Sequence, residues 1–150
     1  MHTFPMTEVF RTWIILSTLF VKYEEPTIRA FFPPEKRDQY VQLLSKANCR
    51  RDALKSFHHD FTFDLKWSKP VDSKSDILEL LKAKGAGPKA YVIGTSKDQS
   101  ILTLDEAFSC LEHEAGILVC KPGELAYYRG EDVKRRLILE RGTSPDNLRR

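Results

Sequence analysis

The chain has 150 residues, of which 41% are hydrophobic and 30% charged, and its formal net charge is +3. This length suits one domain, and the balance of apolar and charged residues excludes a disordered or fibrous protein. The small cationic surplus is spread along the chain, so there is no strong nucleic-acid signal, which would need a clustered basic face. Three cysteines without close spacing argue against a secreted disulfide framework, and we expect a cytoplasmic protein.

The main N-terminal feature is an apolar run over residues 13–21, WIILSTLFV. A helix that spans a bilayer needs about 20 such residues, so no transmembrane segment is predicted. Only Arg11 precedes the run as a basic residue of the kind found in signal peptides, and the charged residues that follow it do not prepare a cleavage site. We expect residues 1–22 to form a peripheral helix or an N-terminal extension, with a signal peptide as the remaining alternative.

Prolines divide the next part of the chain into helices. Pro26 and Pro33 bound a short helix over residues 27–32, and Pro34 begins a longer one that runs to about residue 47. A third helix is expected after Asn48. It contains the densest basic group, formed by Arg50, Arg51 and Lys55, which we interpret as a solvated helix surface.

The periodicity then changes to that of a strand. Apolar residues alternate with polar ones over residues 61–67, which predicts a half-buried strand. Residues 68–75 are polar and predict a loop. A helix is expected from about residue 74 to 84, with Ser73 and Asp76 as its capping pair, and a short strand over residues 90–93 precedes a polar connection.

The strongest local signals lie in residues 103–141. Thr103 and Glu106 form a capping box before an amphipathic helix, and Gly116 stands where a glycine often follows a helix end. The apolar run over residues 117–120 predicts a strand that is buried on both faces. Pro122 and Gly123 suit the two central positions of a type II turn, after which two more strands are expected near residues 125 and 137.

Together these elements predict an α+β fold. We expect N-terminal helices plus a small mixed, mainly antiparallel sheet of 4–5 strands with covering helices, in a single compact domain over residues 23–141. A helix separates the strands near residues 90 and 117, so a crossover that makes these two strands parallel is expected. Residues 142–150 contain little apolar surface and predict a disordered tail.

Candidate catalytic residues are few and lack a recognisable motif. Cys49 precedes the expected third helix and lies beside Arg50 and Arg51, a setting that favours a thiolate, and His58 and His59 could supply a base. Three further residues, Cys110, His113 and Cys120, are of types that bind zinc, but they lack the paired spacing of a zinc site. We therefore predict no metal and no cofactor.

Tyr127, Tyr128 and Arg129 form the least generic surface candidate. Neighbouring residues on a strand face opposite sides, so one tyrosine is expected in the core and the other at the surface beside the arginine. Such a group is typical of a protein-binding surface, although an ordinary sheet edge has the same composition.

These observations favour a small soluble binding or regulatory domain that acts through a protein partner or a small ligand. The alternative is a small enzyme that uses a cysteine or histidine without a local motif. A nucleic-acid accessory protein is a weaker alternative, because the basic residues do not cluster.

Overall fold

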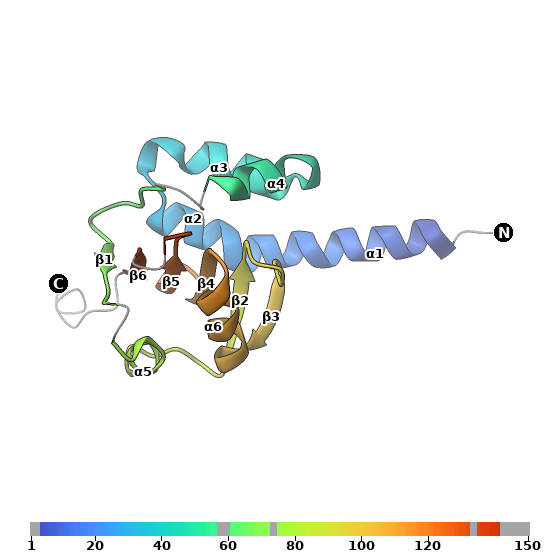
Figure 1. Cartoon of the computed structure of the whole chain (residues 1–150). Helices are drawn as coiled ribbons and strands as arrows, with labels where there is room; N and C mark the ends of the chain where they lie inside the picture. Colours follow the sequence, from blue (N-terminus) through green and yellow to red (C-terminus); the bar gives the residue numbers. More distant parts are fainter. Residues whose placement is uncertain (1–3, 57–60, 73–74, 133–134, 142–150) are drawn as a thin grey trace, which may run out of the picture.

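The computed structural model describes residues 4–56, 61–72, 75–132 and 135–141. Within these residues it has three layers, in which helices cover both faces of one antiparallel sheet (Figure 1). The helical elements are α1 (Phe4–Leu19), the π-helix η1 (Phe20–Glu24), α2 (Glu25–Phe31), the 3-10 turn η2 (Pro34–Lys36), α3 (Arg37–Ser45), α4 (Ala47–Lys55), α5 (Ile77–Ala83) and α6 (Leu104–His113). The strands are β1 (Ser68–Pro70), β2 (Lys89–Ile93), β3 (Ser100–Thr103), β4 (Gly116–Lys121), β5 (Leu125–Arg129) and β6 (Arg136–Glu140).

The sheet has six strands in the order β1-β6-β5-β4-β2-β3, and all five neighbouring pairs are antiparallel. This confirms the predicted α+β fold in a single compact domain, with more strands than expected. The predicted parallel pairing of the strands near residues 90 and 117 is wrong, because β2 and β4 are antiparallel. Strand β3 reverses the chain before α6, so this helix connects β3 and β4, which run in the same direction on either side of β2.

The strand predicted over residues 61–67 is also wrong. Phe61 and Phe63 are buried as the alternation requires, but Leu65 is 80% exposed and the segment joins no ladder. Its backbone is held instead by single contacts: the N–H of Asp64 donates to the carbonyl of Phe31 at 2.8 Å. The period of two therefore predicted the burial of Phe61 and Phe63 correctly, but not the exposure of Leu65, and the segment has no neighbouring strand.

The polar segments that predicted loops contain short strands. Strand β1 lies within residues 68–75, and β3 begins at the end of the polar connection after β2. Helix α5 begins at Ile77, later than predicted, because Asp76 is its N-cap and accepts from the N–H of Glu79 at 3.1 Å. The expected capping residue Ser73 and the predicted tail over residues 142–150 lie outside the described residues.

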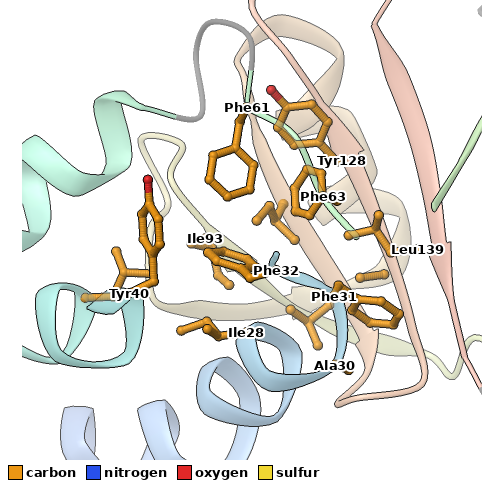
Figure 2. Close-up of a cluster of buried hydrophobic side chains, with 14 of the residues drawn as sticks. Ile28, Ala30, Phe31, Phe32, Tyr40, Phe61, Phe63, Ile93, Tyr128 and Leu139 are labelled. Atoms are coloured by element: carbon orange, nitrogen blue, oxygen red, sulfur yellow. The ribbon is translucent and has the colours of Figure 1, made fainter. Parts of the chain in front are cut away.

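The larger hydrophobic core lies between helices α2 to α4 and one face of the sheet. Figure 2 shows its aromatic centre, where residues from a helix, a loop and a strand meet. The ring of Phe32 lies 5.0 Å from that of Phe61, and the ring of Phe63 lies 4.9 Å from that of Tyr128, both with steeply inclined planes. Edge-to-face contacts of this kind add to the free energy from burial.

A second core lies on the opposite face, under α5 and α6. Strand β4 contributes to both cores, since Ile117 and Val119 face the first and Leu118 faces the second. The prediction of a strand buried on both faces is therefore confirmed. The helices contribute Ile77, Leu81, Leu104, Ala107 and Leu111.

Two local predictions are confirmed and one is wrong. Thr103 and Glu106 form both bonds of the capping box, and Gly123 has the positive φ, 74°, that the turn after β4 requires. Gly116 does not follow the helix end directly but begins β4. A Cβ at Gly116 would lie 2.7 Å from the carbonyl oxygen of Ile93, so a glycine here lets β4 approach β2 closely.

Candidate interaction site at the projecting helix

Helix α1 extends away from the three layers, and among the described residues its N-terminal end lies far from the sheet (Figure 1). Three consecutive apolar side chains on it lie largely in solvent, with exposed fractions of 62% for Trp13, 43% for Ile14 and 57% for Ile15. Successive residues of an α-helix are about 100° apart around its axis, so these side chains point in three different directions. The domain therefore leaves more than half of the circumference of α1 uncovered at this level.

The base of α1 is firmly joined to the domain. The helix continues through η1 into α2, and Phe20 is buried in the first core with Leu19 packed against it. Pro26 has no N–H to donate to the carbonyl of Lys22, so the regular helical ladder is interrupted at this point. The N–H of Glu25 bonds instead to the carbonyl of Phe20, which widens the turn into a π-helix.

A buried ionic network lies at this junction. Glu24, at the end of η1, is fully buried and accepts from Nη1 and Nη2 of Arg50, each at 2.8 Å. Arg50 also donates from Nε and Nη2 to Asp98, each at 2.8 Å, and from Nη1 to the carbonyl of Leu44 at 2.9 Å. All N–H groups of this guanidinium are thus engaged. The hydroxyl of Tyr91 donates to Glu24 as well.

Two carboxylates share one guanidinium in this network. Burial raises the pKa of Glu24, and the nearby Asp98 adds to this, whereas Arg50 and Tyr91 act in the opposite direction. The pKa of Tyr91 is also raised, first by burial and then by the charge of Glu24. Since no donor of Arg50 is left for a ligand, the network joins η1, α4, β2 and the β2–β3 loop as a structural tie that fixes the base of α1.

A surface cavity of about 510 Å³ opens beside this tie, between α4 and the β2–β3 loop. Exposed Arg51 and Lys55 line it, together with the buried side chain of Thr95. The sequence predicts that Arg50, Arg51 and Lys55 all lie on a solvated helix surface. This is wrong for Arg50, which is buried, while Arg51 and Lys55 are exposed.

The hairpin candidates lie elsewhere, in β5. Tyr127 and Tyr128 are both fully buried, and Arg129 is buried beside them. The expectation that one tyrosine is exposed is wrong, because helical layers and loops cover both faces of the sheet: Tyr127 lies against Phe108, and Tyr128 lies against Phe63. A role of Tyr127, Tyr128 and Arg129 in partner binding stays a prediction.

The catalytic candidates are only partly described. Cys49 lies within the first turn of α4 rather than before a helix, and it is half-buried. His58 and His59 lie outside the described residues, so a role for any of the three in catalysis stays a prediction. Burial raises the pKa of Cys120 to about 12. In the described part of the chain no group of three or more His, Cys, Asp or Glu side chains could hold a metal ion.

Sequence reasoning missed the tie of Glu24, Arg50, Tyr91 and Asp98. These residues come from four separate segments, and no motif or spacing relates them. The available signal was at α1, where Ser17 and Thr18 are the two polar residues of the otherwise apolar run over residues 13–21.

Comparison of the chain with protein-family models, with curated proteins and with solved structures found no match. Among the residues that the structure describes, no helix combines the length and apolar character of a membrane span. The function has to be argued from the projecting helix and its surroundings.

Proposed function

We propose that this chain is a binding protein whose contact element is helix α1, held in place by the α+β domain. The observation that supports this is the exposure of Trp13, Ile14 and Ile15 around the helix. Burial of apolar surface contributes about 25 cal/mol of favourable free energy per Å², and contiguous exposed apolar surface is typical of interaction sites. Association would recover this free energy.

The attachment of α1 supports the same function. A contact helix that is already formed and fixed at its base has little conformational entropy to lose on binding. Phe20 in the first core and the tie between Glu24 and Arg50 provide that fixation. The domain would thus present α1 in one direction.

Site-specific photo-crosslinking tests the proposal. A benzoyl-phenylalanine is placed at position 15 on α1 or, as the matched control, at position 65, where Leu65 is more exposed than Ile15 but lies on the domain. Both proteins are irradiated in an extract, membranes included, of the cells that produce the chain. We expect adducts from position 15 in clear excess over position 65. Equal yields from the two positions, or no adduct from position 15, would contradict the proposal.

A further inference from the structure

We infer that a phosphate group binds to Arg129 and Arg136 at the end of the sheet where β5 meets β6, a site separate from the contact helix of the proposed function. Two guanidinium groups lie on one face there, and that of Arg129 has no hydrogen-bonded or ionic partner among the described residues. This is the face of the second core, whereas Phe20 at the base of α1 lies in the first core.

The register of the sheet brings the two arginines together. Arg129 is paired with Arg136 across β5 and β6, so their side chains leave the sheet on the same face with Cβ atoms about 5 Å apart. Tyr127, two residues earlier in β5, shares that face, and its buried hydroxyl accepts from Nη1 of Arg136 at 3.0 Å. Like charges directly opposite one another destabilise a sheet, so an anion bound to both arginines would remove a repulsion.

The burial of Arg129 is the stronger indication of a ligand. The residue is only 6% exposed, and its Nε is buried without a hydrogen-bond partner. Its two terminal nitrogens also have no partner among the described residues, and neither of them is fully enclosed by protein. An unpaired charge is costly to remove from water, and an unsatisfied buried group in a native structure often marks a bound ion. We therefore place the anion at the terminal nitrogens of Arg129.

No carboxylate in the described part of the chain neutralises Arg129 through an ion pair. Glu112 of α6 is the acidic residue whose charge acts on Tyr127, beside the two arginines. It is exposed to solvent and forms no ion pair with Arg129. The positive charge is thus left for a ligand to compensate.

The chemistry of the two arginines favours phosphate over a carboxylate. Together they carry two positive charges, and a phosphate monoester carries a charge of about −1.5 to −2 at neutral pH, with three acceptor oxygens. A carboxylate would neutralise only one of the two arginines. The paired N–H groups of a guanidinium also match phosphate oxygens in a bidentate geometry.

Thermal unfolding of the full chain in phosphate tests the inference. The melting temperature at neutral pH is measured in increasing inorganic phosphate and in sodium chloride of equal ionic strength. A ligand that binds only the folded state raises the melting temperature with its concentration, so we expect a saturable rise in phosphate and none in chloride. O-phosphoserine is a second probe. A rise with both probes would show that the group can be carried on a larger molecule, and a rise with inorganic phosphate alone would assign the site to the free ion.

Substitutions of Arg129 separate binding from stability. Arg129→Met is expected to weaken phosphate binding by at least about tenfold. Without phosphate it should leave the melting temperature unchanged or raise it, because an unpaired buried charge is removed. Arg129→Lys keeps the charge but loses the paired N–H groups, so it should weaken binding by a smaller factor. Arg51→Met, on the exposed side of α4, is the matched control and should bind phosphate like the native chain.

Glu112→Gln tests whether the domain supplies its own counter-charge. We expect this variant to keep its stability without phosphate and to bind phosphate more tightly, because a nearby negative charge is removed. A loss of stability would show that Glu112 neutralises Arg129 and would overturn the inference. Equal effects of phosphate and chloride, or undiminished phosphate binding by both Arg129 variants, would overturn it as well. None of these results depends on α1, for which crosslinking at position 15 is a separate test.

Discussion

Replacement of Arg50 by methionine should strongly destabilise the fold. Methionine has a similar length but neither charge nor donors, so Glu24 would keep only the hydroxyl of Tyr91 as a partner among the bonds of the tie. The carbonyl of Leu44 and the carboxylate of Asp98 would also lose bonds of 2.8 to 2.9 Å. Leaving one partner of a buried ion pair unpaired costs about 3–5 kcal/mol.

Urea unfolding followed by circular dichroism measures this loss. A decrease of 3–5 kcal/mol is a large part of the roughly 5–15 kcal/mol that stabilises a domain, and we expect the melting temperature to fall by about 10 °C. Arg51→Met is the matched control, because Arg51 is the next residue of α4 and is exposed. It should change the free energy of unfolding by less than about 0.5 kcal/mol. Equal effects of the two substitutions would show that the tie does not stabilise the base of α1.

The pH dependence of Glu24→Gln tests the electrostatics of the same tie. Burial raises the pKa of Glu24 above its ordinary value of 4.5, so between these two values the folded state binds more protons than the unfolded state. The stabilisation from this group is complete below pH 4.5 and is lost as the pH rises through the raised value. Glutamine cannot titrate, so the stability of Glu24→Gln relative to the native chain should increase as the pH rises above 4.5. A relative decrease would mean that Arg50 outweighs burial.

Three further predictions concern the sheet and its two cores. Gly116→Ala should lower the free energy of unfolding in urea by about 1–3 kcal/mol, because the added Cβ would meet the backbone of β2. Gly87→Ala is the control and should leave it nearly unchanged, because no atom lies within 4 Å of the added Cβ. Phe63→Ala should lower the free energy of unfolding by about 3–5 kcal/mol, because Phe63 is buried, and Leu65→Ala should lower it by less than about 0.5 kcal/mol, because Leu65 is exposed. Similar values for the two variants would contradict the observed burial. The raised pKa of Cys120 should make its alkylation at pH 8 much slower in the folded than in the urea-unfolded chain, which mass spectrometry of the labelled peptides can follow.

Features that depend on a few neighbouring residues could be predicted from the sequence. The capping box of Thr103 and Glu106 and the turn at Gly123 are formed by contacts within four residues, so the residue types alone specify them. The strand over residues 117–120 was also predictable, because a short apolar run bounded by Gly116 and the Pro122–Gly123 turn is typical of a strand that is covered on both faces.

Tertiary structure decided the rest. The alternation over residues 61–67 specified the burial of Phe61 and Phe63, but a strand also needs a partner ladder. This segment lies instead between α3 and the face of the sheet, where Phe61 contacts Tyr40 and Phe63 contacts Tyr128. The short strands β1 and β3 contain little apolar pattern and exist because neighbouring strands supply their hydrogen bonds. Tyr127 and Tyr128 are both buried because both faces of the sheet are covered, which a single strand does not reveal.

At the junction of α1 with the domain, some features are determined by the local sequence and others by the tertiary structure. The sequence shows that residues 13–21 are mostly apolar and that Pro26 interrupts a helix. These two features determine a mostly apolar helix with an irregular turn at its base. That α1 is exposed, and that Glu24 meets Arg50, was decided by the fold. Such long-range contacts depend on how four distant segments pack, and their free energy exists only once the domain has excluded water from them.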